Sequence, residues 1–171
     1  TSNAGLLEAM AEAGQAVDRD ARRIRFDPGF VEEALRRSPS TYTLAARDPA
    51  LDLPLDGSGG YLATDGCPAD VIDLETGERR PGTKRDLEQI TRLADALPQI
   101  AFHWQPVSAN DTPVPIRPIH ETHAQLPNTT KHIQQMTAID PLNARGIVEL
   151  ARVVAGGSEE LRARPIVSNF Q

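Results

Sequence analysis

The sequence predicts an α/β fold with an irregular first half and a regular second half. Apolar residues recur at helical spacing before residue 40, and short strand-like runs separated by turn residues follow up to residue 82. From residue 83 to residue 171, strand and helix patterns alternate about every 30 residues, the length of one βα unit. We therefore divide the chain into residues 1–82, with N-terminal helices and a β meander, and residues 83–171, with the first βα units.

The composition is that of a globular chain of ordinary size. Its 171 residues include 18 Lys and Arg against 24 Asp and Glu, a formal charge of −6, and 39% are hydrophobic. Nucleic acid is not an expected partner, because affinity for phosphate begins with clustered Lys and Arg and the chain has no basic block. No apolar run approaches the roughly 18 residues of a membrane span, and no secretory leader opens the chain. We expect a cytoplasmic protein without membrane association.

Two amphipathic helices are expected before residue 40. The first occupies Ala4–Ala13, with Gly14 placed to adopt the left-handed conformation that ends a helix. The second begins at Asp27 as N-cap and Pro28 as first helical residue, and the Ser38–Pro39 pair stops it.

Short antiparallel strands are expected next. The candidate runs share apolar or β-branched residues bounded by Asp-Gly, Asp-Pro or Thr-Gly pairs, and they are residues 42–45, 51–55, 61–64 and 71–74. Pro54 places its strand at a sheet edge, since proline cannot donate a ladder hydrogen bond. The glycines at 57, 59 and 60 have the wrong spacing for a dinucleotide-binding fingerprint and are interpreted as a hairpin loop.

The second half predicts parallel strands joined by helices. Thr83 and Asp86 form a capping-box pattern at the first helix start. The helices are expected at 83–97, 119–126 and 140–155, and the strands at 100–104, 133–137 and 166–170. These 89 residues hold about three βα units, whereas a closed (β/α)8 barrel takes roughly 250 residues. The segment is either a small open sheet with an appended hairpin region or the front part of a barrel.

Polar residues in the three strands favour the barrel. Strands buried on both faces read as unbroken apolar runs, but these are interrupted by His103, Gln105, Gln134, Gln135, Ser168 and Asn169. Such side chains suit a barrel interior or mouth. The chain also begins without Met and ends directly after a strand-like run, so we expect a piece of a longer protein.

The histidines and the cysteine give weak signals. His120 and His123 lie three residues apart on a helix, a spacing that can chelate zinc, but no third ligand stands at a recognisable distance, so no metal site is expected. His103 is interpreted as a hydrogen-bonded interior histidine. Cys67 precedes a proline in a turn, has no neighbouring base, and cannot form an internal disulfide.

Several long segments carry a family resemblance. They are Phe26–Pro49, Val71–Thr83 (VIDLETGERRPGT), Leu93–Pro98, Asn128–Lys131 and Pro165–Asn169. Together they resemble the trimethylamine:corrinoid methyltransferase family over essentially the whole chain. The resemblance implies the N-terminal part of a (β/α)8 barrel of the TIM type, with about three βα units, preceded by two helices and an antiparallel β meander.

The resemblance also implies an activity. The family moves a methyl group from a tertiary or quaternary methylamine, of the trimethylamine or glycine betaine type, to the cobalt of a corrinoid. The corrinoid is carried by a separate protein, so no directly bound cofactor is expected, and the full-length form is expected to be a homo-oligomer. The present chain alone is expected to be inactive. The alternative is a non-catalytic interaction or assembly module derived from this fold.

The expected substrate site lies at the C-terminal ends of the barrel strands, where such enzymes build their sites. Neutral amides there can orient an amine or a carboxylate, and the candidate substrate-binding residues are Gln105, Gln134, Asn169 and Gln171. Trp104 or Phe170 could offer a ring face to an ammonium group. No catalytic residue is assigned.

Overall fold

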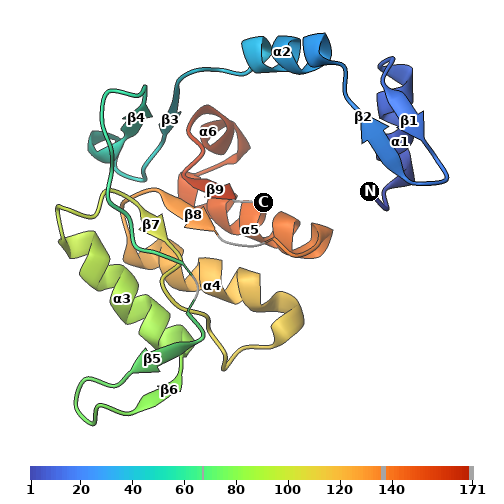
Figure 1. The fold of residues 1–171 in the computed structure, drawn as a ribbon. Helices are drawn as coiled ribbons and strands as arrows, with labels where there is room; N and C mark the ends of the chain where they lie inside the picture. The colour runs from blue at the N-terminus through green and yellow to red at the C-terminus, as the bar shows by residue number, and fades with distance from the viewer. Residues whose placement is uncertain (67, 136–137, 170–171) are drawn as a thin grey trace. The chain divides into compact units, whose positions relative to one another are not determined.

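A computed structural model describes residues 1–66, 68–135 and 138–169 of the chain (Figure 1). The chain separates into two compact units, Thr1–Ser40 and Thr41–Gln171. The boundary after residue 82 rests on a change of sequence pattern and stays a prediction.

The first unit contains the two expected helices and a hairpin. Its elements in chain order are α1 (Ala4–Glu12), β1 (Ala16–Asp18), β2 (Arg23–Arg25) and α2 (Pro28–Arg37). Gly14 has φ +78°, the left-handed value predicted after the first helix. The Asp27 carboxylate accepts the Gly29 amide at 2.9 Å, which confirms the predicted N-cap.

The β1–β2 hairpin was not expected from the sequence. The two strands pair antiparallel, with Val17 opposite Ile24 as the apolar pair. Because charged residues surround these two positions, no run of alternating polarity long enough to indicate a strand is present.

Two antiparallel hairpins open the second unit in place of the expected single meander. β3 (Tyr42–Leu44) pairs with β4 (Leu53–Leu55), and β5 (Asp70–Ile72) pairs with β6 (Arg79–Pro81). The run at 61–64 joins neither of them: Ala63 forms a parallel bridge with Phe102, and Leu62 accepts the Ala101 amide at 2.7 Å. The backbone ahead of β7 thus offers this run a partner that the sequence pattern does not reveal. Pro54 lies in a two-stranded sheet, where every strand is an edge, as predicted.

A three-stranded parallel sheet with the order β7-β8-β9 follows. Its elements and connections are α3 (Lys84–Ala96), β7 (His103–Trp104), α4 (Arg117–Gln125), β8 (Ile133–Gln135), α5 (Pro141–Ala155), α6 (Ser158–Ala163) and β9 (Val167–Asn169). Short 3₁₀ turns lie at Pro49–Leu51, Val114–Ile116 and Leu126–Asn128. α3 packs beside α4, and α4 beside α5 (Figure 1). This is the predicted alternation of strands and crossover helices.

Helix ends follow the predicted signals. Thr83 and Asp86 form the capping box of α3, and Asp140 caps α5 by accepting the Asn143 amide at 2.8 Å. Gly156, with φ +96°, ends α5. The six-residue α6 was not expected, because its polar sequence is too short to show an apolar stripe.

The segment after β3 is fastened to the N-terminal ends of the parallel strands. Arg47 donates to the backbone carbonyls of Leu126 at 2.6 Å and Thr129 at 3.2 Å. The His132 ring nitrogen Nδ1 lies 2.9 Å from the Ala45 carbonyl oxygen and donates to it. These bonds join residues about eighty positions apart, so the β3–β4 hairpin closes this end of the sheet. Among the described residues, no helix is long and apolar enough to cross a membrane.

Candidate functional site at the C-terminal ends of the parallel strands

The register of the sheet sorts its polar residues into two sets. Trp104 lies opposite Gln134, and Gln134 lies opposite Ser168, so these three share one face. Gln135 lies opposite Asn169 on the other face. The two faces have different neighbours, and therefore different chemical possibilities.

The face of Gln135 is covered by helix α4. Gln135 Nε2 donates to Gln105 Oε1 at 3.0 Å, and Gln125 Nε2 of α4 donates to Gln135 Oε1 at 3.1 Å. The relative exposure of these three glutamines is 0–1%. Their amides thus bond to one another beneath the helix, and Gln105 Nε2 also donates to the Val107 carbonyl at 3.3 Å.

Glu121 of α4 joins the same group. Its Oε1 atom accepts the Ala109 backbone amide at 2.9 Å, and its carboxylate accepts a hydrogen bond from the Gln105 amide. Burial raises the pKa of the Glu121 carboxyl above its ordinary value, and these two hydrogen bonds oppose that rise. The carboxylate thereby holds the loop that leaves β7.

The opposite face, called the open face below, carries Trp104, Gln134 and Ser168. Trp104 and Gln134 are half-buried. Ser168 Oγ donates to His132 Nε2 at 2.8 Å, and Thr64 Oγ1 accepts the Trp104 backbone amide at 2.9 Å. An indole ring beside a neutral amide suits a cationic amine, which is attracted by the ring face and oriented by the amide oxygen.

The structure separates the predicted substrate-binding residues. Gln134 lies on the open face, and Gln105 is buried under α4. Asn169 is exposed at the end of β9, at a cavity of about 290 Å³ lined by apolar residues of α5 and by Leu161 of α6. Gln171 lies outside the described residues, as do Cys67 and Phe170. The substrate-binding roles of Gln105, Gln134, Asn169 and Gln171 stay predictions.

The β5–β6 hairpin lies at the C-terminal ends of the parallel strands. Its base is joined to the loop after β7 because the Ser108 amide donates to the Pro68 carbonyl at 3.0 Å and the Asn110 amide donates to the Gly82 carbonyl at 2.9 Å. The Asn110 side chain adds a hydrogen bond to the Ala69 carbonyl at 2.7 Å. The hairpin is therefore part of the surface around the strand ends.

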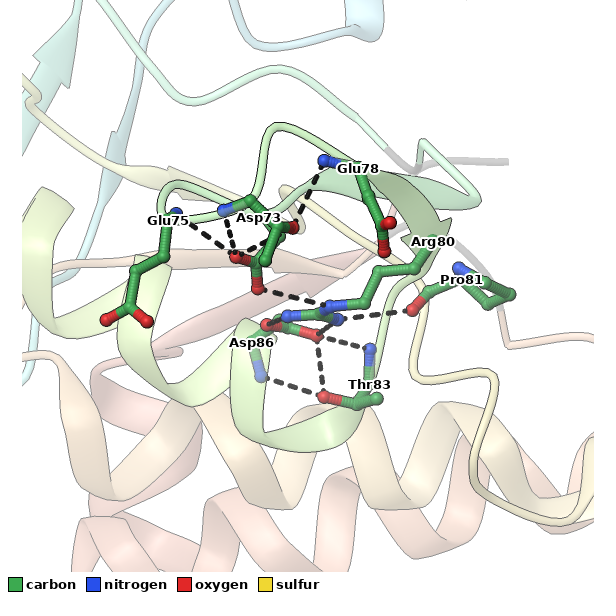
Figure 2. Close-up of polar contacts among 8 residues, drawn as sticks. Asp73, Glu75, Glu78, Arg80, Pro81, Thr83 and Asp86 are labelled. Atoms are coloured by element: carbon green, nitrogen blue, oxygen red, sulfur yellow. Dashed lines mark hydrogen bonds and ion pairs between the residues drawn. The ribbon is translucent and has the colours of Figure 1, made fainter.

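Arg80 fastens this hairpin to the first turn of α3, as Figure 2 shows. Its guanidinium makes two hydrogen bonds to the Asp86 carboxylate, at 2.7 and 2.9 Å. Asp86 also accepts the Thr83 amide at 2.9 Å and lies at the positive end of the helix. The Arg80 guanidinium holds the pKa of the Asp86 carboxyl far below its usual range. The sequence pattern predicts the capping box but not the arginine, which only the fold of the hairpin brings to it.

The loop of the hairpin is organised by one aspartate. The Asp73 carboxylate accepts the amides of Glu75 and Thr76, both at 3.1 Å, and lies 3.6 Å from the Arg80 guanidinium (Figure 2). The charged residues of the VIDLETGERRPGT segment thus shape the hairpin and fix its position.

His103 is a hydrogen-bonded interior histidine, as predicted. It is fully buried in β7, and its Nε2 atom lies 3.1 Å from the Thr91 carbonyl oxygen. Burial lowers the pKa of its ring below the ordinary value for histidine. His123 is exposed, with Nδ1 3.3 Å from Lys84 Nζ. Within the described residues, no group of three or more His, Cys, Asp or Glu side chains could hold a metal ion.

The comparison with known families covers nearly the whole chain. Residues 1–170 match the family model described as trimethylamine methyltransferase (MTTB). The chain belongs to the trimethylamine methyltransferase family. Membership accounts for the resemblance carried by the hairpin, by the Asn128–Lys131 segment and by β9.

Individual relatives place the chain within larger proteins. It is 33% identical over 162 residues to a trimethylamine methyltransferase of Desulfitobacterium hafniense (strain DSM 10664 / DCB-2), covering 95% of this chain and 32% of that protein. It is 26% identical to a glycine betaine methyltransferase of Desulfitobacterium hafniense (strain Y51), covering 94% of this chain and 33% of that protein. A trimethylamine methyltransferase of Methanosarcina thermophila is 27% identical, with 92% and 32% covered. The chain spans about a third of the length of these relatives.

Proposed function

We propose that this chain contributes the first part of an enzyme that moves a methyl group from a tertiary or quaternary methylamine to the cobalt of a corrinoid protein. Relatives named for trimethylamine and for glycine betaine support this substrate class. The single observation that carries the proposal in the structure is the open face at the strand ends, where Trp104 and Gln134 lie in register. Both side chains suit an amine with methyl groups.

Methyl transfer requires that the substrate is held in a fixed orientation and that water is excluded from the site. The cobalt, here a substrate carried by the partner, gives the electron pair that forms the cobalt–carbon bond, and the pair of the broken carbon–nitrogen bond stays on the amine nitrogen. The methyl carbon must therefore lie in line between nitrogen and cobalt, in a site that excludes water. Trp104 can hold the amine by its ring face, and Gln134 can orient it.

We further propose that β7, β8 and β9 are strands of a (β/α)8 barrel whose interior is the face of Gln134. The observed order is that of consecutive barrel strands, and the helices pack on the other face. About three units of such a barrel are present in this chain. Alone, it should transfer no methyl groups, because most of the strand ends that would surround the substrate lie outside it.

A second candidate function rests on the surface of the β5–β6 hairpin. Ile72 and Leu74 have relative exposures of 71% and 101%, and Leu93 on α3 has 62%, beside a groove of about 330 Å³. Exposed apolar residues grouped around a groove are typical of protein contact surfaces. A non-catalytic assembly module would use this surface and would not need the open face of the sheet.

Methyl transfer separates the two functions. The polypeptide encoded by the complete reading frame is mixed with its corrinoid protein, a reductant that keeps cobalt nucleophilic, and trimethylamine or glycine betaine in turn. We expect one of them to change the corrinoid absorption spectrum to that of the methylated form. No change with any tertiary or quaternary methylamine, with a corrinoid protein proven active with another methyl donor, would leave the assembly module as the better reading.

A further inference from the structure

The four buried polar side chains under α4 form a closed ring of hydrogen bonds. Gln125 donates to Gln135 at 3.1 Å, Gln135 donates to Gln105 at 3.0 Å, and Gln105 donates to Glu121. Gln125 and Glu121 lie one helical turn apart, and Gln125 Nε2 also donates to the Glu121 carbonyl at 3.2 Å. Gln135 and Gln105 each accept on one side and donate on the other, whereas Gln125 donates on both sides and its Oε1 atom has no hydrogen-bond partner among the described residues. The Glu121 carboxylate, which accepts, sets the direction in which Gln105 and Gln135 point.

The ring joins the three elements that shape the strand ends. Gln105 directly follows β7, Gln135 ends β8, and the other two members belong to α4. Through Ala109, the Glu121 carboxylate also fixes the loop after β7, at 2.9 Å. That loop in turn carries the base of the β5–β6 hairpin.

Burying this ring is expensive compared with an apolar filling. The relative exposures of its members are 5% for Glu121, 1% for Gln105 and 0% for Gln125 and Gln135. Polar groups removed from water contribute little net stability even when they are hydrogen-bonded, and Gln125 Oε1 has no partner among the described residues. The hydrogen bonds that are made still favour one arrangement of the segments they join. The ring therefore fixes the relative positions of β7, β8 and α4 at the end of the sheet.

We infer that this ring is a positioning device for the substrate site, with Glu121 as its anchor and Gln105 as a positioning residue. This inference rests on the proposed function, because it places the substrate on the opposite face of the same strands. None of the ring members needs to touch the substrate. They hold the segments on which Trp104 and Gln134 are mounted.

The substitution Glu121→Gln tests the ring with almost no change of shape. The introduced amide can still accept the Ala109 amide, but its NH₂ group then meets the NH₂ group of Gln105, so two donors face each other. Flipping the side-chain amides of Gln105, Gln135 and Gln125 would remove this clash. It would also turn the Gln125 NH₂ group away from the backbone carbonyl of residue 121, to which it donates. Combining Glu121→Gln with Gln105→Glu restores the donor–acceptor match with both ring neighbours of position 105, since the carboxylate there accepts from each. Only the 3.3 Å hydrogen bond from Gln105 Nε2 to the Val107 carbonyl is lost.

Hydrogen exchange on the present chain gives a readout independent of catalysis. In Glu121→Gln we expect the Ala109 amide to exchange at least about tenfold faster, while the Asp48 amide, bonded to the Thr130 carbonyl at the other end of the sheet, keeps its protection. The double substitution should recover most of the Ala109 protection, and Glu8→Gln on the exposed face of α1 should change neither amide. Unchanged Ala109 protection, or equal loss at Ala109 and Asp48, would overturn the inference.

The second experiment measures kcat and KM of the polypeptide encoded by the complete reading frame. We expect Glu121→Gln to lower kcat about tenfold or more with little change in KM, because the substrate is still bound but wrongly aligned, and the double substitution to recover kcat. An unchanged kcat would overturn the positioning role. If the wild type transfers no methyl group at all, the proposed function fails by itself, and the exchange experiment still decides whether the ring holds the loop.

Discussion

At the scale of single residues, charged side chains in this chain mostly hold segments together. Arg80 with Asp86 joins a hairpin to a helix, and Arg164 makes two hydrogen bonds to Asp52, at 2.7 and 2.8 Å, across more than a hundred residues. Lys131 is 6% exposed and donates to the carbonyls of Ala94 and Leu97 at the end of α3. These contacts fix where helices begin and end relative to the strands.

Asp86→Asn should show the value of one such contact. We expect the free energy of unfolding at pH 7 to fall by about 1–2 kcal/mol, because the substitution removes a charged capping partner of α3 and the ion pair with Arg80, whose partial exposure screens the pair. Urea titration of the present chain measures this. The exposed residue Asp20, substituted in the same way, should change the free energy of unfolding by less than about 0.5 kcal/mol.

The pH dependence gives the same contact a second test. The pKa of Asp86 is lower in the folded chain than in the unfolded chain, so the extra stability is complete above the unfolded value, near 3.9, and is lost as the pH falls toward the folded value. The difference between wild type and Asp86→Asn should therefore shrink steadily below about pH 4. A difference that stays constant down to pH 2.5 would contradict this assignment.

At the scale of elements, local signals predicted what short stretches of sequence determine. Helix starts at Asp27 and Thr83 and helix ends at Gly14 and Gly156 follow from caps and backbone conformation. The partners of strands did not follow in the same way, because the run at 61–64 reads like a meander strand and bonds instead to the backbone near Phe102. Pairing depends on residues far away in the chain.

The candidate site shows the same division. The sequence placed polar side chains at the strand ends, and the structure does bring Gln105 and Gln134 there. Which face each would occupy depends on strands only two or three residues long, where a shift of one residue exchanges the faces. Glu121 received no functional interpretation, because an acidic residue on a helix is usually solvated. Its position four residues before Gln125 is the signal that could have indicated a shared buried contact.

A substitution at Gly82 tests how closely the β5–β6 hairpin must approach the loop after β7. A methyl group at this position would lie 2.3 Å from Val107 Cγ2 and 2.9 Å from the Ser108 carbonyl oxygen. We expect Gly82→Ala to lower the free energy of unfolding by about 1–3 kcal/mol, because the two segments must separate. Gly59→Ala is the matched control: nothing lies within 4 Å of the added carbon, so the change should be neutral or slightly stabilising. Equal effects of the two substitutions, measured by urea denaturation, would argue against this packing.

At the scale of the whole molecule, the parallel sheet has a strand edge and an apolar surface that favour association with other protein segments. Within the described residues, β9 pairs only with β8, and the apolar cavity of about 290 Å³ lies beside it between α5 and α6. An unpaired strand edge next to apolar helix surface favours association. In the proposed barrel, further βα units would cover both.

The isolated chain should therefore associate. Sedimentation at tens of micromolar, an order of magnitude at which such contacts form, should show dimers or larger species in place of a monomer. Lys substituted for Val148, which is 54% exposed and lines the same cavity, should shift the distribution toward monomer. A compact monomer for the unsubstituted chain at these concentrations would count against an open edge.

The central claim is that methyl transfer takes place at the C-terminal ends of the parallel strands, on the face of Gln134. The most direct measurement is kcat/KM for corrinoid methylation by the complete polypeptide carrying either Gln134→Ala or Gln99→Ala. Gln99 is an exposed glutamine just before β7, at the opposite end of the same sheet. We predict that Gln134→Ala lowers kcat/KM by roughly 5- to 150-fold, the loss of about 1–3 kcal/mol for a polar contact with the bound amine, and that Gln99→Ala leaves it unchanged. Equal kcat/KM values for the two variants, with both proteins folded, would contradict the claim.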